Sequence, residues 1–382
     1  MTLQEAQTAF TATEVPADIL DRPELATLTV RQLMWERFTR NRLSVVAGVV
    51  IVLLYSSSAL AGFLSPYALE HTHSTHPGVG PNGLHIIDSS GNLRWPFVYG
   101  YEARLDLQTY AMVYRQTDET YPVRFFAAGD EYTLLFVVDT NVHLFGVDEP
   151  GKLFLLGTDP LGRDFFTRIL YGSQVSLTVG LVGIFLTVVI GSLVGVSAGL
   201  FGGVWDNVSM RIVEVLMSFP RIPLWMALAA ALPANLNPIQ VYFGITIVLS
   251  VIGWGSLSRQ VRAKVLALRD LDYVMAARLT NCSTSRIIIQ HLFPNTLSHV
   301  IVVATLAIPG MILGETALSF LGLGIRAPMT SWGLLLSDAQ QLNVLLGKPW
   351  LLWAIVPVMV TAICFNLVGD GLRDAADPFA GE

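Results

Sequence analysis

The stretch that decides the fold is Asp272-Tyr273-Val274-Met275-Ala276-Ala277-Arg278-Leu279, followed by Asn281 and then by His291-Leu292-Phe293-Pro294-Asn295. This stretch is polar, and a long apolar run flanks it on each side. An α-helix needs ~20 largely apolar residues to cross ~30 Å of hydrocarbon, and both runs are of that order. We therefore expect a polar helix–turn–helix that is held outside the membrane between two spans.

The composition independently indicates a membrane protein. The chain is 53% hydrophobic and 14% charged, and its mean hydropathy is +0.56, whereas a soluble domain carries roughly a quarter charged residues. Backbone groups cannot be left unpaired in lipid, so each apolar run is expected to be a helix. Six runs predict an all-α polytopic membrane protein with six transmembrane helices: Leu43–Leu64, Val175–Leu200, Ile212–Leu232, Ile239–Leu257, Val300–Leu318 and Leu351–Val368.

The polar stretch resembles the EAA coupling loop of binding-protein-dependent ABC importer permeases. Four further motifs narrow the resemblance to the dipeptide/oligopeptide/nickel permease family. In chain order they are Asn41-Arg42 before Leu43; Gly157-Thr158-Asp159-Pro160-Leu161-Gly162-Arg163-Asp164 with Arg168, Gly172 and Ser176-Leu177; Glu315 to Gly324 with Ser331-Trp332-Gly333; and Phe365 to Asp374 with Asp377-Pro378. Together they cover the chain from about Val30 to Pro378, except most of the region between Pro66 and Gly157.

The resemblance implies the type I ABC importer permease fold and alternating access. It also implies the partners: a homologous second permease subunit, two ATPase subunits at the coupling loop, and an extracytoplasmic substrate-binding protein. Dipeptides or oligopeptides are the implied cargo, with oligosaccharides or nickel complexes as alternatives. ATP and Mg²⁺ would be held by the ATPase subunits, so no cofactor is expected on this chain. Membrane lipid is an expected partner and nucleic acid is not.

Six residues of the coupling loop are implied to contact the ATPase: Tyr273, Met275, Ala276, Ala277, Asn281 and Pro294. The two alanines remove side-chain bulk from a helix face, which would permit close approach to a groove. Met275 stands where the family usually has Glu, which deletes a charge at the contact. Asn281 stands where the family usually has Gly, and Asn is the residue after Gly that best adopts positive φ. The alternative is an ordinary cytoplasmic loop.

A phosphate-binding Gly-x-x-x-x-Gly-Lys-Ser/Thr loop is absent from the sequence. Gly347-Lys348 is followed by Pro349, and Gly151-Lys152 is followed by Leu153. The chain is therefore not expected to be an enzyme, and ATP hydrolysis is assigned to another subunit.

Polar residues inside spans are expensive and are functional candidates by default. Arg221 lies about halfway along the third predicted span, between Pro220 and Pro223, and broken helices at membrane depth normally line protein or water cavities. Arg221 and Glu315 are the predicted pathway residues, and the alternative for Arg221 is a structural arginine held by freed backbone carbonyls. For Glu214, a local ion pair with Arg211 is the simpler interpretation.

The second predicted span carries Gly191, Gly195 and Gly199, four residues apart. Such a stripe of small residues lets another helix pack closely. It indicates either a sliding or heterodimer surface or packing within the chain, and we favour the second.

Basic residues near span ends indicate orientation, because they are enriched in cytoplasmic loops. They predict both termini in the cytoplasm, and the family resemblance implies that the membrane is the inner membrane of a bacterium. The expected organisation is a cytoplasmic tail with an interfacial helix (1–42), the first span (43–64), an extracytoplasmic insert (65–164), a permease core (165–376, coupling loop about 258–296) and a cytoplasmic C-terminus (377–382). No cleavable signal peptide is expected, and Met1–Ala26 is expected to be disordered.

A short helix is expected before the first span. Val30, Leu33, Met34 and Phe38 recur at helical spacing, which favours a helix on the inner membrane surface. A continuation of the first span is the alternative.

The insert Ser65–Asp164 contains thirteen Asp or Glu and six Lys or Arg, a formal charge of −7. Its first half is expected to be loop, and its second half to contain strands around Tyr121–Phe126, Tyr132–Asp139 and Lys152–Leu156. The expected turns are Gly129-Asp130 and Glu149-Pro150-Gly151. The sequence thus predicts a small strand-containing cap.

The His and Cys residues predict no metal site or disulfide. His71, His73 and His76, with His85 nearby, specify no metal geometry. Cys282 and Cys364 fall in the coupling loop and the last span, so they are not expected to pair.

Two other classes of function remain as alternatives. A secondary transporter would need proton-relay carboxylates or an inverted repeat, and a membrane-embedded enzyme would need a constellation of catalytic groups at membrane depth. The sequence favours neither.

Overall fold

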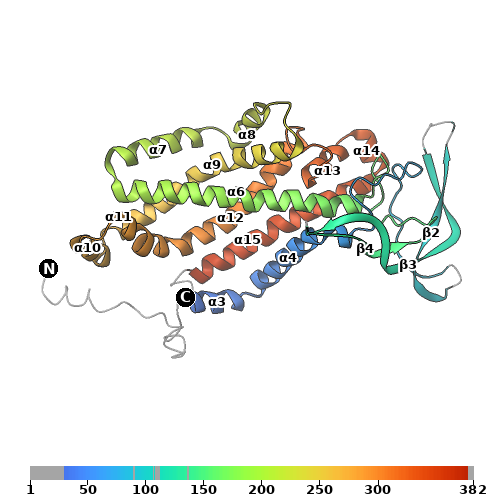
Figure 1. Ribbon diagram of the computed structural model, residues 1–382, viewed down its shortest axis with the longest axis horizontal. Coiled ribbons are helices and arrows are strands. Elements are labelled where there is room, and N and C mark those ends of the chain that lie inside the picture. Colours follow the sequence, from blue (N-terminus) through green and yellow to red (C-terminus); the bar gives the residue numbers. More distant parts are fainter. Residues whose placement is uncertain (1–29, 89–90, 106, 108–111, 136, 377–382) are drawn as a thin grey trace.

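The computed structural model describes residues 30–88, 91–105, 107, 112–135 and 137–376. The predicted disordered tail Met1–Ala26 and the C-terminal segment 377–382 lie outside these residues. The described chain is a bundle of long helices, with a small sheet at one end and the polar helix–turn–helix at the other (Figure 1).

Five helical runs are long and apolar enough to cross a membrane. They are α4 (Arg42–Ala59), α6 (Phe165–Phe201), α9 (Pro238–Leu268), the run of α11 (Thr284–Arg286), the π-helical turn η2 (Ile287–Leu292) and α12 (Phe293–Phe320), and the run of η3 (Pro349–Ala354) and α15 (Ile355–Ala376). These correspond to the first, second, fourth, fifth and sixth predicted spans. The mostly helical fold is confirmed.

The third predicted span, Ile212–Leu232, is wrong as a single helix. The structure has α7 (Gly203–Ser218) and α8 (Arg221–Ala230), bent by 91° from one another. Pro220 disfavours helical geometry in the residue before it, and Phe219 is extended, with φ −86° and ψ 141°. Arg221 is therefore the first residue of α8 and does not lie inside a continuous span. Pro223 falls in the first helical turn, where a missing N–H is tolerated.

The glycine stripe of α6 packs against α9 of the same chain. An ideal Cβ on Gly191 would lie 3.0 Å from the Trp254 carbonyl oxygen, and one on Gly195 would lie 2.6 Å from the Ser258 carbonyl oxygen. A Cβ on Gly199 would come within 2.9 Å of the Val265 Cβ. The interpretation of the stripe as intrachain packing is confirmed.

A short helix precedes the first span, as predicted. Helix α3 (Val30–Arg40) ends at Asn41, whose side chain accepts a hydrogen bond from Ser44 N (3.3 Å) and caps α4. The Ser44 hydroxyl in turn donates to the Leu367 carbonyl of α15 (2.9 Å). The Asn41-Arg42 motif therefore separates α3 from the span and fixes α4 against the last helix.

The region after α4 and α5 (Ala61–Leu64) contains a four-stranded antiparallel sheet in the order β1-β2-β3-β4. The strands are β1 (His85–Ile87), β2 (Leu93–Leu105), β3 (Met112–Leu134) and β4 (Val138–Val147). The strand-containing cap is confirmed, and the predicted strand Tyr121–Phe126 lies within β3. The predicted strand Tyr132–Asp139 instead covers the end of β3, the hairpin turn and the start of β4.

Three details of the predicted insert are wrong. The run Lys152–Leu156 is not a strand; its residues Leu153 and Phe154 are fully buried and fill the base of the sheet, so their apolar character reflects packing. Strand β2 lies in the half that was expected to be loop. Gly129-Asp130 is not a turn, since β3 passes through it with a shift in register between Ala128 and Tyr132.

Two short helices complete the end of the bundle next to the sheet. Helix α13 (Trp332–Ala339) begins at Ser331, whose hydroxyl accepts from Leu334 N (3.2 Å), and α14 (Leu342–Gly347) follows it. Buried Trp332 donates its indole N–H to the Ile169 carbonyl of α6 (3.1 Å). This contact ties the α12–α13 connection to the beginning of α6.

The α6–α9 contact makes a direct prediction. Gly195→Ala places a methyl group against a backbone carbonyl that cannot rotate away, and we expect it to destabilise the folded chain by ~1–3 kcal/mol. The measurement is thermal unfolding of the purified protein in detergent. The matched control is Gly310→Ala in α12, where a Cβ would meet nothing within 4 Å. Equal unfolding temperatures for the two variants would contradict the prediction.

Candidate functional sites

The polar helix–turn–helix contains α10 (Asp272–Leu279), which ends in a Schellman motif. Cys282 N donates to the Ala277 carbonyl (3.0 Å), and Asn281 N donates to the Arg278 carbonyl (3.0 Å). Asn281 has φ 58°, which confirms the prediction that it takes the positive φ of the usual glycine. The chain then reverses into α11 and the π-helical turn η2.

The two alanines of α10 lie on different faces. Ala277 is 8% exposed and, together with Val274, packs against a core that includes Val261 and Leu292. Ala276 is exposed. The prediction that both alanines form one small face toward a partner is therefore wrong for Ala277, because residues one apart on a helix diverge by about 100°.

The outward face of this segment carries exposed apolar side chains beside exposed charges such as Arg278 and Arg286. Met275 is 44% exposed and Leu279 is 85% exposed, and Ile289 of η2 is 67% exposed. Tyr273 is also exposed, and its ring centroid lies 6.2 Å from that of His291. Pro294, in the first turn of α12, is exposed as well. Of the six predicted contact residues, all but Ala277 remain accessible.

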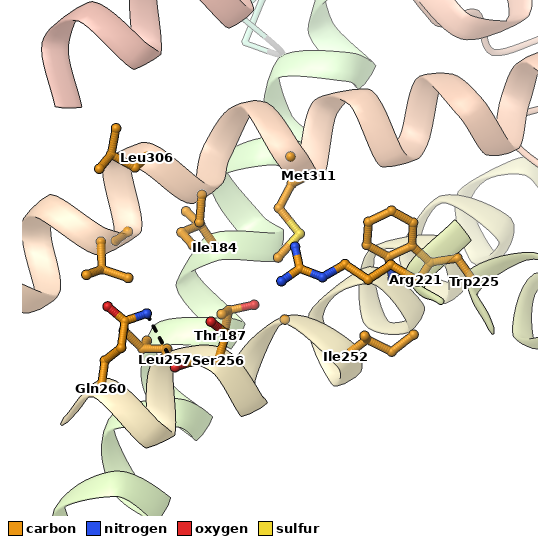
Figure 2. A pocket seen from close by; sticks show the side chains of 15 residues that line it. Ile184, Thr187, Arg221, Trp225, Ile252, Ser256, Leu257, Gln260, Leu306 and Met311 are labelled. Atoms are coloured by element: carbon orange, nitrogen blue, oxygen red, sulfur yellow. Dashed lines mark hydrogen bonds between the residues drawn. The ribbon is translucent and has the colours of Figure 1, made fainter. Parts of the chain in front are cut away.

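A cavity of about 360 Å³ lies between α6, α8, α9 and α12. Figure 2 shows the Arg221 side chain extending from α8 into this space toward Met311 and Thr187. Ile184, Ile252, Leu257 and other apolar side chains supply most of the wall. The cavity thus brings together α6, the consecutive helices α8 and α9, and α12.

Five polar side chains line the cavity: Arg221, Thr187, Trp225, Ser256 and Gln260. Gln260 Nε2 donates to the Ser256 carbonyl (3.4 Å). The Thr187 hydroxyl and the Trp225 indole N–H are buried, and neither has a hydrogen-bond partner. Within the part of the chain that the structure describes, no carboxylate pairs with Arg221 and none lines the cavity. The arrangement offers hydrogen-bond donors and one positive charge to a ligand that carries acceptors.

Glu315, the other predicted pathway residue, does not line this cavity. Its carboxylate is fully buried and accepts hydrogen bonds from Ser176 Oγ (3.0 Å) and Ser319 Oγ (2.7 Å). Ser176 Oγ also accepts from Trp332 N (3.1 Å). Glu315 therefore joins α6, α12 and the beginning of α13. In α7, Arg211 Nη1 and Glu214 Oε2 lie 2.9 Å apart, which confirms the predicted local pair.

The Gly157–Asp164 motif forms a buried ionic clamp before α6. Asp159 accepts from Arg163 Nε (2.7 Å) and from Arg168 Nη1 (2.8 Å), and Asp338 Oδ2 of α13 lies 3.1 Å from the same Arg168 nitrogen. Asp159 and Arg168 are 1% and 3% exposed. Since a buried charge needs a well-placed partner, the motif is best explained by fold stability.

The same motif joins the insert to α6. Gly162 has φ 81°, and a Cβ there would lie 2.3 Å from the His73 carbonyl oxygen. Thr158 Oγ1 donates to the His76 carbonyl (2.7 Å) and accepts from Val79 N (2.8 Å). Asp164 caps α6 by accepting from Thr167 N (2.8 Å), and burial raises the pKa of its carboxyl to about 7.

The histidines of the insert belong to this packing. His73 is buried against the Tyr67 and Phe154 rings, and burial lowers its pKa to about 3. His71 Nδ1 lies 2.8 Å from Asp130 Oδ2. Among the residues that the structure describes, no group of three or more His, Cys, Asp or Glu is placed to hold a metal ion. Cys282 and Cys364 are free thiols.

Thr187 and Trp225 were missed from the sequence. Trp225 comes four residues after Arg221, so the two side chains share a helix face. This spacing could have indicated that Trp225 lies beside Arg221 at the same site. Thr187 lies in an apolar helix, where nothing in the sequence distinguishes it from the other hydroxyl residues of the spans.

Comparison with known proteins supplies the family. Residues 188–381 match the family model for binding-protein-dependent transport system inner membrane components, and residues 29–80 match the N-terminal transmembrane domain of oligopeptide transport permease C. The oligopeptide transport system permease protein OppC of Haemophilus influenzae is 43% identical over 226 residues, which are 58% of this chain and 69% of that protein. The dipeptide transport system permease protein DppC of Bacillus subtilis is 41% identical over 223 residues, 58% of this chain and 68% of that protein.

One solved structure, an inward-facing form of the MetNI methionine ABC transporter, aligns with a TM-score of 0.41 and 17% identity over 55% of this chain and 96% of the solved chain. The family model covers half of the chain. The alignments with the two relatives cover more than two thirds of the length of each relative. This chain belongs to the family of binding-protein-dependent transport system inner membrane components.

Proposed function

We propose that this chain is a permease subunit of an ABC importer that carries dipeptides or oligopeptides across the bacterial inner membrane by alternating access. The peptide cargo is supported by the OppC and DppC relatives, which are peptide transport permeases. The single observation that carries the proposal is the cavity at Arg221, where one guanidinium extends into a largely apolar space (Figure 2).

The chemistry of the cavity matches the carboxyl end of a peptide. A guanidinium can hold a carboxylate by two parallel hydrogen bonds. The Trp225 N–H and the Thr187 hydroxyl can donate to peptide carbonyls, and the apolar wall suits side chains of varied shape. A nickel cation would instead require carboxylate, His or thiolate ligands, which the described lining does not offer.

The assembly that we propose contains a homologous second permease subunit and two ATPase subunits. Members of this family work with ATPase and binding-protein partners. The ATPases would hold ATP and Mg²⁺ and would dock on α10, where Met275, Leu279 and Ile289 expose apolar surface. Met275 in place of the usual glutamate makes this a contact dominated by apolar packing.

We propose that both termini are cytoplasmic and that the insert faces outward. Helix α3, the end of α15 and α10 lie at the end of the bundle opposite the sheet (Figure 1), which agrees with the basic residues of the termini and of the coupling loop. The binding protein would then meet the insert from outside.

The insert presents an acidic surface to that partner. Five of its six basic residues are already paired with its own acids, as in Arg104–Glu102 and Arg124–Asp148. Exposed Asp118 and Glu119, by contrast, have no basic partner among the described residues. Such a surface should steer a basic patch over a Debye length of ~8 Å at physiological salt.

The pathway role of Arg221 has a paired test. In the reconstituted importer, Arg221→Gln should lower the affinity for a free peptide by about 10- to 100-fold, the range of one charged hydrogen bond, and Arg221→Lys should restore only part of it. A peptide amidated at its carboxyl end should be affected much less. Arg211→Gln, an arginine paired with Glu214 outside the cavity, serves as the control. Equal losses of affinity for the free and the amidated peptide would show that Arg221 has a structural role and does not bind the carboxylate.

The two alanines of α10 provide the test of docking. Ala276→Arg should leave the permease folded and reduce co-purification with the ATPase and coupled uptake, because the long side chain projects from the docking face. Ala277→Arg should instead lower the thermal stability of the permease itself, because it forces a charge into the packed core. Wild-type transport by the Ala276→Arg variant would exclude this face as the contact.

Charge reversal on β3 tests the docking of the binding protein. Asp118→Lys should slow association of the binding protein and flatten its dependence on salt, whereas Arg115→Glu on the same strand should have the opposite effect. Surface plasmon resonance at two ionic strengths measures both. Unchanged association rates for both variants would place the docking surface elsewhere.

A further inference from the structure

The outer end of the β3–β4 hairpin is an apolar projection. We call its residues Leu134, Leu135, Val137 and Val138 the hairpin tip. Leu135 is 54% exposed, Val137 is 82% exposed and Val138 is 54% exposed. In an insert of charge −7, the four described tip residues carry no charge, although the sheet also exposes other apolar side chains, such as those of Leu93, Trp95 and Phe126.

The hairpin runs back along the chain toward the first span. Asp130 Oδ2 accepts a hydrogen bond from Ala68 N (2.9 Å), and two residues later the Tyr132 ring packs on Gly62, where a Cβ would lie 2.3 Å from it. Moving toward the tip along β3 therefore means moving back toward the end of α4 at Ala59. Figure 1 shows the hairpin curving to the outer end of α4.

Strand β4 fixes the hairpin in this direction. The ring nitrogens of buried His143 lie near three backbone carbonyls: Nδ1 is 2.6 Å from the Ser65 oxygen and 3.0 Å from the Gly62 oxygen, and Nε2 is 3.0 Å from the Asp130 oxygen. Tyr132 donates its hydroxyl to the Val142 carbonyl (2.7 Å). These contacts connect both strands to α5, which directly follows the first span.

The depth of the tip follows from the length of α4. Its 18 residues extend about 27 Å at 1.5 Å per residue, which is close to the ~30 Å of the hydrocarbon layer. Gly62, just after α4, thus lies at the outer boundary of that layer. The two strand residues from Tyr132 to Leu134 add about 7 Å at ~3.4 Å each, which brings the tip to the depth of ~5–10 Å typical of interfacial segments.

The neighbouring surface is lipid-facing. Only 17% of the residues of α4 are buried within the protein, compared with 50% of the most apolar window of α6, and Val46, Val49 and Val52 are exposed along it. The tip continues this apolar surface at its outer end. Asp139 accepts a hydrogen bond from the Thr133 hydroxyl (2.7 Å) at the base of the tip, so the apolar segment ends at the level of the polar interface.

We propose that the hairpin tip inserts into the outer leaflet of the bilayer beside α4 and anchors the extracytoplasmic insert on the membrane surface. The anchor would keep the sheet at a fixed height and tilt, with its acidic strand surface directed away from the lipid. This inference depends on the membrane orientation under Proposed function and not on the identity of the cargo.

A depth measurement on the assembled importer in lipid nanodiscs tests the proposal. Val137→Cys is labelled with the environment-sensitive dye NBD in a Cys282→Ser, Cys364→Ser background, and its quenching by nitroxides on lipid acyl chains is compared with quenching by iodide in water. Leu107→Cys, between β2 and β3 and 77% exposed, is the matched control. Val138→Cys repeats the measurement should labelling at 137 disturb the tip.

We expect blue-shifted emission and several-fold stronger quenching by the lipid nitroxides than by iodide at position 137, and the reverse at position 107. Strong iodide quenching at 137 would overturn the proposal. Protection from both quenchers would also overturn it, because a protein partner would then cover the tip. ATP hydrolysis and uptake by the labelled complex, measured in parallel, report the proposed transport function separately from the anchor.

Discussion

The buried pair of Asp159 and Arg168 is the constraint on which the outer half of the molecule depends. Either charge alone would be strongly unfavourable in this environment, so the chain must bring both together with the groups that satisfy them. Asp159 orients its own loop through the amides of Leu161 and Arg163, and Arg168 reaches Asp338 on α13. The Asp159 carboxylate thus determines where three segments meet: the loop before α6, the beginning of α6 and the α12–α13 connection. The insert is attached to that junction.

The Glu315 network lies one layer farther along α6. Ser176 is about two helical turns after Arg168, and it bridges Glu315 to the backbone of Trp332. The family motifs that looked like separate signatures in the sequence are therefore contiguous in space. They hold together the outer ends of α6 and α12, whose middle portions form part of the cavity wall.

The sequence predicted five of the spans in their order because hydrophobic length is a strong local signal. It also predicted the positive φ of Asn281, which depends on one residue. It could not predict the burial of Ala277, since two adjacent alanines give no information about which face meets α9 and α12. The sequence indicated that Pro220 and Pro223 interrupt the third predicted span, but it did not predict the 91° bend at Phe219-Pro220. A proline permits either a kink or a helix start, and tertiary packing decides between them. The sheet shows the same limit, since Lys152–Leu156 has strand-like residues that are buried without pairing, whereas β2 pairs with β3 over much of its length.

Thr187 and Trp225 became candidates only when the cavity placed them near Arg221, because their unpaired donors are a property of the packing.

The continuous helical run from Thr284 to Phe320 has a mechanical consequence. It connects the η2 end, where we propose that the ATPase docks, to the Glu315 network through one body. A displacement at η2 would therefore be transmitted as by a lever and would not be absorbed by a loop. Its stiffness is uneven. Pro309 lies inside α12 and removes one backbone hydrogen bond, and the adjacent Gly310 has no neighbour within 4 Å of a would-be Cβ. The position where α12 bends most easily therefore lies at the cavity wall, and so does the open space beside Gly310. Bending of α12 would thus first change the volume of the cavity around Arg221.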